Sequence, residues 1–381
     1  MAPVLPGATI GFFGGGQLGR MTGYAARALG YDLRVLDPDA TAPARAVASE
    51  TITASFTDAE AAERLARGCG VITAEIEKIG VASLEAALRY APVRPSPAVY
   101  HVVQDRGRQK QWLADHGFPL GAWALASTAE ECAAAVARVG APAVVKSCHG
   151  GYDGRSQVRV ARAQDATDAF ASLGGAPVVV ERLLDLDVEL SVLVARRPSG
   201  ETVAYPASRN HHVRGILSWS VIPSGLPGDV LREGERVARG IAGSLGVEGL
   251  LCVELFLTRD GRVLVNELAP RPHNSYHTSE RACVTSQFEQ LVRAVCDLPL
   301  GATDVVVPGA ILNLLGDVWA EGPPDFARVL ELPGVKVHLY GKASARPGRK
   351  MGHLSAIGAT AEEALARVRQ AGELLGVRAE S

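Results

Sequence analysis

Two glutamates occupy neighbouring predicted strands in the second half of the chain. Glu254 lies within the apolar run 252–256, and Glu267 ends the run 262–267. The segment 258–261 contains Asp-Gly, which predicts a hairpin that brings the two runs together. Two carboxylates on one half-buried face repel each other unless a cation lies between them, and such oxygen ligands suit Mg²⁺ that also binds substrate phosphates. We therefore expect a metal at these two glutamates, with two unrelated surface side chains as the alternative.

A lysine and a glycine-rich loop follow each other near the middle of the chain. Lys146 closes the apolar run 143–146, and the loop 150–157 contains three further glycines and Arg155. An ammonium group suits phosphate as a compact point charge, and a glycine loop can wrap phosphates with its backbone N–H groups. This pair predicts a nucleotide phosphate site, while the alternative is a polar hairpin tip beside an exposed lysine.

The segment 269–275, directly after Glu267, holds a cation, an imidazole and an amide between prolines. These are Arg271, His273 and Asn274, a set that suits holding an anion while charge develops in a transition state. His273 and His277 have the spacing of a helical metal pair, but the prolines make a helix doubtful there, and we do not expect a histidine metal site.

A second cationic segment lies near the C-terminus. Residues 346–353 contain Arg346, Arg349 and Lys350 within five positions. Such a cluster can bind an anionic group, and a solvated turn is the alternative.

The first glycine-rich turn of the chain favours another reading. Gly14-x-Gly16-x-x-Gly19 follows the apolar run 9–13, and Asp37 ends the next predicted strand. This arrangement fits a dinucleotide-binding fingerprint and hence an NAD-dependent oxidoreductase. The same turn also serves other ligand sites or plain tight packing, and the oxidoreductase reading leaves the paired glutamates unexplained.

The elements that must position these residues fall into three parts, an α/β and α+β multidomain fold. Predicted strands at 9–13, 33–36 and 70–73 around a helix at 20–29 form a half-Rossmann domain, which we place at 1–105. A mixture of helices and antiparallel strands follows at 106–300, with a lid subdomain at about 106–182. A small β-rich C-terminal domain occupies 301–381, with strands near 310–314 and 335–340 and a final helix at 361–375.

Composition excludes several classes of protein. The 381 residues are 47% hydrophobic and 21% charged, which is typical of a folded globular protein. The net charge of −2 argues against nucleic acid as a partner. No apolar run reaches the roughly 18–20 residues of a membrane span, and the N-terminus does not look like a signal peptide, so we expect a cytoplasmic protein with no membrane partner. The six cysteines form no C-x-x-C pair, which indicates neither a zinc site nor a disulfide framework.

Taken together, five blocks resemble the 5-(carboxyamino)imidazole ribonucleotide synthases, the ATP-grasp enzymes of bacterial and fungal purine biosynthesis. The blocks occur in that family's order at 14–21, 72–77, 150–157, 266–275 and 346–353. The resemblance implies a pre-ATP-grasp N-terminal domain and an ATP-grasp central domain. It also implies ATP and Mg²⁺ as cofactors, a homodimer, and the ATP-dependent carboxylation of 5-aminoimidazole ribonucleotide by bicarbonate through carboxyphosphate.

The resemblance also implies roles for individual residues. ATP would be bound by Arg106, Lys146, Gly151, Tyr152, Asp153, Gly154, Arg155, Ser156, Gln157, Glu181, Arg182, Leu183, Leu184, Glu189, His212, Asn266 and Glu267. Mg²⁺ would be bound by Glu254 and Glu267, and the aminoimidazole nucleotide by Gln17, Leu18, Glu75, Lys342, Arg349 and Lys350. The reacting groups would be surrounded by Tyr152, Asp153, Arg155, Arg271, His273 and Asn274.

Two other functions stay open. A sibling ATP-grasp ligase, such as the formate-using glycinamide ribonucleotide transformylase, would share the nucleotide site, although the blocks 17–21 and 346–353 favour the imidazole substrate. A catalytically silent homologue is the third possibility, because Ser156 and Tyr276 stand where the family usually has glycine. We expect the Tyr276 ring to lie close to the bicarbonate site.

Overall fold

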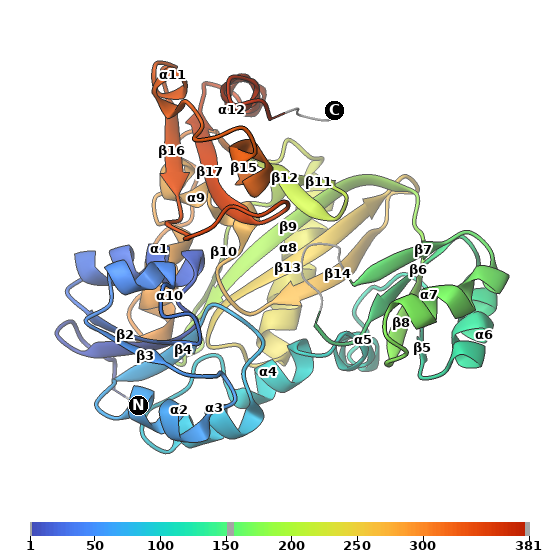
Figure 1. Ribbon diagram of the computed structural model, residues 1–381, viewed down its shortest axis with the longest axis horizontal. Coiled ribbons are helices and arrows are strands. Elements are labelled where there is room, and N and C mark those ends of the chain that lie inside the picture. Colours follow the sequence, from blue (N-terminus) through green and yellow to red (C-terminus); the bar gives the residue numbers. More distant parts are fainter. Residues whose placement is uncertain (1, 151–155, 378–381) are drawn as a thin grey trace.

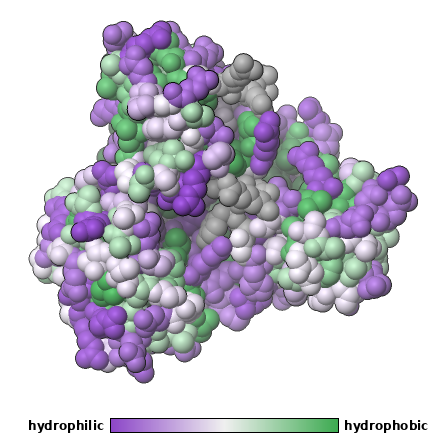
Figure 2. All heavy atoms as spheres, in the orientation of Figure 1, coloured by the Kyte–Doolittle hydropathy of each residue, from purple (hydrophilic) through white to green (hydrophobic). Residues whose placement is uncertain are grey.

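The computed structural model describes residues 2–150 and 156–377. Its elements form three bodies, each built on one β-sheet (Figure 1). Figure 2 shows the face on which the three bodies surround a hollow. The expected site residues Gly151, Tyr152, Asp153, Gly154 and Arg155 lie outside the described residues.

The N-terminal body is a parallel sheet in the order β3-β2-β1-β4. Its strands are β1 (Thr9–Phe13), β2 (Asp32–Asp37), β3 (Glu50–Thr53) and β4 (Val71–Ala74). Helix α1 (Gln17–Ala28) packs on one face, and α2 (Ala59–Ala66) and α3 (Val81–Leu88) pack on the other. Because both faces are covered, the central strands are apolar on both sides, as parallel strands usually are. Helices α4 (Pro97–Val103) and α5 (Arg106–Asp115) lead into the next body.

The second body is a small antiparallel sheet in the order β5-β8-β6-β7. Its strands are β5 (Trp123–Ala126), β6 (Ala143–Ser147), β7 (Gln157–Val160) and β8 (Val178–Arg182). Helices α6 (Ala129–Val139) and α7 (Ala166–Ser172) pack against these strands around Phe170, Val136 and Val180. We refer to this body as the lid sheet.

The central body is a nine-stranded sheet in the order β14-β13-β9-β11-β12-β15-β17-β16, with β10 on β9. Its strands are β9 (Leu186–Arg196), β10 (Thr202–Ala204), β11 (Ser208–Val213), β12 (Ile216–Ile222), β13 (Gly249–Thr258), β14 (Val263–Ala269), β15 (Gly309–Leu315), β16 (Val335–Leu339) and β17 (Lys350–Ile357). The packed helices are α8 (Gly228–Ser244), α9 (Ser279–Ala282), α10 (Gln287–Val295), α11 (Phe326–Leu330) and α12 (Ala361–Glu373). The strands expected in a small C-terminal domain therefore extend the central sheet, because β12 pairs with β15.

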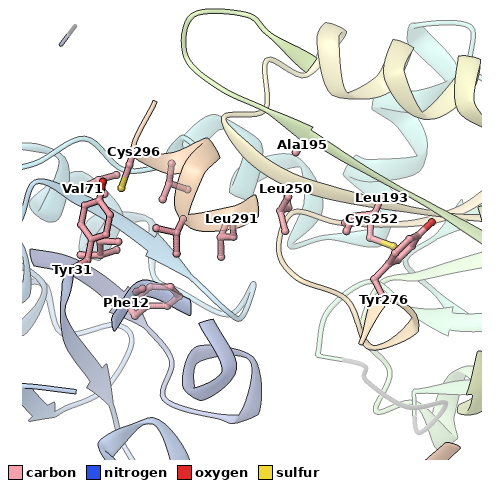
Figure 3. Packing of buried hydrophobic residues seen from close by; sticks show 14 of the residues in the cluster. Phe12, Tyr31, Val71, Leu193, Ala195, Leu250, Cys252, Tyr276, Leu291 and Cys296 are labelled. Atoms are coloured by element: carbon pink, nitrogen blue, oxygen red, sulfur yellow. The ribbon is translucent and has the colours of Figure 1, made fainter. Parts of the chain in front are cut away.

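One apolar cluster joins the N-terminal sheet to the central sheet through α10 (Figure 3). Phe12 and Val71 from the first sheet and Leu291 from α10 are each at most 1% exposed, as is Leu250 at the start of β13. Burial of side chains of this size stabilises the junction by about 1.5–3 kcal/mol each. The two bodies therefore hold the residues at their shared edge in a fixed arrangement.

Candidate active site

The first glycine turn binds two carboxylates of the protein itself. The N–H of Gly15 donates to Asp37 Oδ2 at 2.7 Å. Glu75, which follows β4, accepts from the N–H of Gly16 and from that of Gly19, the latter at 2.6 Å. These carboxylates occupy the donors that a dinucleotide pyrophosphate would need at the start of α1. The geometry argues against the oxidoreductase reading.

Glu75 also explains why α1 begins earlier than its sequence predicts. The helix starts at Gln17 rather than at Arg20, because the carboxylate satisfies N–H groups of the first turn. Glu75 is 7% exposed, and burial raises its pKa while the N–H groups of the turn oppose that shift. The expected nucleotide contacts Gln17 and Leu18 lie in this same first turn, with Leu18 buried.

The expected phosphate-binding lysine has a carboxylate partner in the lid sheet. Lys146, on β6, forms an ion pair with Glu181 Oε2, on the neighbouring strand β8. The ammonium of Lys110 forms a second ion pair with Glu181 Oε1, at 2.7 Å. Burial opposes ionisation of the carboxyl, but the two lysines lower the pKa of Glu181 to about 2. The lid sheet thus presents a buried carboxylate between two cations.

Lys110 is a residue of this site that sequence reasoning missed. It lies in α5 one turn after Arg106, so both side chains lie on one face of the helix. Asp105 caps the helix by accepting the N–H of Arg108 at 2.7 Å, and Arg106 donates to the carbonyl of Ser147 at 2.9 Å. The helical spacing of the two cations was the pattern that could have revealed Lys110.

Three further expected ATP contacts, Arg182, Leu183 and Leu184, directly follow Glu181. Arg182 ends β8, and its N–H donates to the carbonyl of Ala122 at 2.9 Å. Leu183 donates its N–H to the carbonyl of Pro142 at 2.9 Å, and Leu184 follows it. These bonds fix the peptide that links the lid sheet to β9.

Two further expected ATP contacts, Glu189 on β9 and His212 on β11, form an ion pair. His212 Nδ1 lies 2.5 Å from Glu189 Oε2. Burial disfavours the charged imidazole, but Glu189 raises the pKa of His212 overall. The pair borders an open hollow of about 220 Å³ that Asn210 and Trp219 also line.

The two metal-candidate glutamates face each other across adjacent strands. Glu254 on β13 stands opposite Glu267 on β14, and the expected hairpin between them forms through Gly261, whose φ is +81°. Asn266 Nδ2 donates to Glu254 Oε2 at 3.1 Å, and His273 Nε2 lies 3.1 Å from Glu254 Oε1. The carboxylates therefore share one face, as the sequence pattern predicts.

The two carboxylates differ in acidity. Burial works against ionisation, but His273 and His212 hold the pKa of Glu254 at about 2. Burial raises the pKa of Glu267; Arg106 opposes this shift, and the neighbouring Glu254 adds to it. Two buried carboxylates with this repulsion favour a cation between them.

The loop after Glu267 brings a cation and an amide to the same edge. Arg271 Nε donates to Glu77 Oε1 at 2.7 Å, and both side chains are at most 15% exposed. Gln104 donates to the backbone carbonyl of Glu77 at 2.6 Å. Neither polar atom of the buried Asn274 side chain has a hydrogen-bond partner among the described residues. Glu77 belongs to the sequence block 72–77. Its ion pair with Arg271, 194 positions away, could not be predicted from residue spacing.

His273 and His277 do not act as a pair. His273 Nδ1 lies 2.8 Å from Ser275 Oγ, while its other nitrogen faces Glu254. The His277 ring stacks on His353 with centroids 4.7 Å apart. Residues Asn274–Tyr276 form a single 3₁₀ turn, which points the two rings in different directions.

The Tyr276 ring, which we expect close to the bicarbonate site, points into the core. The ring is 0% exposed and belongs to the apolar cluster between the two sheets, beside Cys252 and Leu193 (Figure 3). The hydroxyl donates to the carbonyls of Ser191 at 2.7 Å and Pro206 at 3.0 Å. The side chain points into the core because these carbonyls satisfy its only polar group there. Tyr276 is therefore a buried residue of the core cluster.

The cationic segment near the C-terminus lies next to the N-terminal body. Arg20 of α1 donates to the carbonyl of Tyr340 at 2.7 Å, and Lys342 donates to the carbonyl of Lys350 at 2.6 Å. Arg349 donates to the carbonyl of Ser344 at 3.0 Å. Its guanidinium also contributes to lowering the pKa of Asp39, which follows β2, although Thr41 is the main cause. Lys342, Arg349 and Lys350 thus lie at the edge that the first glycine turn also borders.

Ser156 and Gln157 bound the undescribed part of the central glycine loop. The carbonyl of Ser156 accepts from the N–H of Ser147 at 3.0 Å, and Gln157 begins β7 opposite Lys146. The end of the loop is therefore anchored next to the lysine.

Known protein families cover most of the chain. Residues 7–104 match the ribonucleotide synthetase preATP-grasp domain, residues 111–288 match the ATP-grasp domain, and residues 309–367 match the phosphoribosylaminoimidazole carboxylase C-terminal domain. Among the described residues, no helix combines the length and apolar character needed to cross a membrane.

Relatives and solved structures agree with these family matches. The N5-carboxyaminoimidazole ribonucleotide synthase of Mycobacterium tuberculosis is 43% identical over 367 residues, covering 92% of this chain and 83% of that protein. The Staphylococcus aureus N5-carboxyaminoimidazole synthetase complexed with ADP superposes with a TM-score of 0.92 at 31% identity, over 97% of this chain and 98% of that one. The Aspergillus clavatus enzyme in complex with ADP and 5-aminoimidazole ribonucleotide gives 0.89 at 29% identity, over 97% and 98%.

These matches confirm the fold class and the family that the five sequence blocks indicate. The chain contains an ATP-grasp domain, the domain of ATP-dependent ligases, and it belongs to the N5-carboxyaminoimidazole ribonucleotide synthase family of purine biosynthesis.

Proposed function

We propose that this chain carboxylates 5-aminoimidazole ribonucleotide with bicarbonate and cleaves ATP to ADP in doing so. Bicarbonate oxygen attacks the γ-phosphorus of ATP, which forms carboxyphosphate and releases ADP. The exocyclic amine of the nucleotide then attacks the carboxyl carbon, the bond from that carbon to the phosphate oxygen breaks, and phosphate and a proton leave. The observation that carries this proposal is the facing pair Glu254 and Glu267, with Arg106 and Lys146 acting on the second carboxylate.

ATP would lie between the lid sheet and the central sheet. Lys146 and Arg106 would neutralise its phosphates, and Glu189 with His212 would contact its ribose end. The remaining ATP contacts in the proposal are Gly151, Tyr152, Asp153, Gly154, Arg155, Ser156, Gln157, Glu181, Arg182, Leu183, Leu184, Asn266 and Glu267. Phosphoryl transfer depends on such positioning and charge neutralisation more than on covalent help.

The residues at the carboxylate pair fit Mg²⁺. Glu254 and Glu267 offer facing oxygen ligands, and burial, with a smaller contribution from Glu254, raises the pKa of Glu267. Mg²⁺ is commonly bound by one or two carboxylates together with oxygens of substrate phosphates. When bound there, Mg²⁺ would neutralise charge on the phosphates of ATP.

The loop after β14 would hold the reacting carboxyl group. Glu77 keeps the Arg271 guanidinium in place, and the buried Asn274 amide three residues later has no hydrogen-bond partner among the described residues. His273 would add an N–H donor beside Glu254. Tyr152, Asp153 and Arg155 are included in the proposal from the sequence resemblance alone.

The aminoimidazole nucleotide would lie between the N-terminal body and the C-terminal strands. Gln17, Leu18 and Glu75 line the start of α1, and Lys342, Arg349 and Lys350 would bind the phosphate. The contact between Arg20 and the Tyr340 carbonyl holds the two edges together. The rival transformylase reading has no observation of its own in its favour.

The family resemblance further implies a cytoplasmic homodimer, and we include both in the proposal. Light scattering on the purified protein should give about twice the 39.9 kDa chain mass. A mass of one chain would contradict the dimer.

The reaction is tested by ADP release from purified protein with Mg-ATP and bicarbonate. Turnover should require 5-aminoimidazole ribonucleotide, because the sequence blocks 17–21 and 346–353 favour that acceptor. Formate with glycinamide ribonucleotide serves as the matched control. Turnover with the control pair, or none with the imidazole nucleotide, would contradict the proposal.

Replacing Glu267 with Gln should remove most activity without unfolding the protein. The substitution keeps the size of the side chain but removes a carboxylate from the proposed metal site, and we expect kcat to fall at least about 100-fold. Thermal unfolding and ADP binding without Mg²⁺ should stay close to those of the wild type. Normal turnover of E267Q would refute the metal assignment.

Replacing Lys350 with Ala should weaken binding of the aminoimidazole nucleotide but not binding of ATP. Loss of a charge-assisted hydrogen bond costs about 1.5–3 kcal/mol, so KM for that nucleotide should rise about 10-fold to 100-fold. KM for ATP should stay the same. Lys336→Ala, at an exposed position on β16, is the matched control. An unchanged nucleotide KM in K350A would remove the phosphate role.

A further inference from the structure

Two lysines share one buried carboxylate at the proposed ATP site. The side chains of Lys110, Lys146 and Glu181 are 8%, 16% and 14% exposed. With both ammonium groups charged and the carboxyl ionised, this trio alone carries one surplus positive charge, and the nearby Glu267 also acts on both lysines. Buried charge of one sign is costly unless an opposite charge neutralises it, so the trio is suited to receive an anion.

The two lysines are anchored differently. Lys110 comes from α5, and its Nζ also donates to the carbonyl of Val265 on β14, at 3.4 Å. Gln109, its neighbour in the helix, accepts the N–H of Leu268 on the same strand at 3.1 Å. Lys146 instead lies on β6, in the lid sheet, next to the glycine loop. Lys110 therefore bridges the lid sheet to the strand of Glu267.

Phosphate binding changes the balance of charge within the trio. If Lys146 turns to the phosphates, as the proposed function requires, Glu181 loses one of its two cations. A buried carboxylate left without any cation would oppose that movement strongly.

We propose that Lys110 is a positioning residue for ATP binding. Lys110 keeps its ion pair with Glu181 when Lys146 moves to the nucleotide phosphates. Lys110 need not touch the nucleotide. It lowers the cost of releasing Lys146 from its ion pair, and through Val265 it keeps Glu181 aligned with the metal-binding strand. This inference rests on the proposed function.

The test is a comparison of K110M in two backgrounds, with Mg-ADP affinity measured by calorimetry. In the otherwise wild-type protein, K110M should weaken Mg-ADP at least about 10-fold, because charge-assisted contacts of this kind are worth at least about 1.5 kcal/mol. In the E181Q background the same substitution should change affinity less than about twofold, because a neutral amide needs no retaining cation. Equal losses in the two backgrounds, or no loss in either, would overturn the proposal.

Steady-state kinetics separates this role from a structural one. K110M should raise KM for ATP while KM for the aminoimidazole nucleotide stays unchanged, and K110R, which keeps the charge, should recover part of the ATP affinity. A parallel rise in both KM values would contradict a role confined to ATP. K110Q replaces K110M if the latter does not fold, and the exposed Lys336→Met is the matched control.

The wild-type protein separates failure of this inference from failure of the function. Wild-type protein that binds Mg-ADP and turns over the imidazole nucleotide, together with K110M of unchanged affinity, would overturn only the role of Lys110. Wild-type protein that binds no Mg-ADP would overturn the proposed function and this inference with it.

Discussion

The balance of charge among buried carboxylates governs how this molecule is built. Glu75, Glu181, Glu254 and Glu267 are all withdrawn from solvent, and each needs donors or cations in return. The N–H groups of the first glycine turn serve Glu75, two lysines serve Glu181, and His273 serves Glu254. Burial raises the pKa of Glu267 and the facing Glu254 adds to that shift, so an external cation would favour ionisation of this pair.

These carboxylates come from different sheets, so their partners also join the sheets. Lys110 connects β8 to β14, Glu77 connects the N-terminal body to Arg271, and the Tyr276 hydroxyl connects the loop after β14 to β9. Each connection satisfies a group that would be costly to bury alone. The same contacts that stabilise the fold therefore bring the candidate catalytic residues to one edge.

The sequence could predict the local features, since these depend on neighbouring positions. The strand and glycine patterns predict the N-terminal sheet, and Asp-Gly at 260–261 predicts the hairpin that sets Glu254 opposite Glu267. Long-range pairings were not predictable: nothing near Lys110 or Glu77 indicates partners on β8 or after β14. The burial of the Tyr276 ring was not predictable for the same reason, because the carbonyls that accept its hydroxyl lie 70 and 85 positions away.

The continuity of the central sheet from β14 to β16 fixes the distance between the two proposed substrate sites. Backbone hydrogen bonds run without interruption from the strand of the metal candidates to the strands beside the cationic segment. The sheet therefore keeps a constant distance between two points of the proposed site. One is the cationic segment that would bind the phosphate of the aminoimidazole nucleotide, and the other is the glutamate pair beside which ATP would be cleaved. The backbone of the central sheet therefore sets the separation between these two points, whereas the lid sheet and the N-terminal sheet are hydrogen-bonded separately from it.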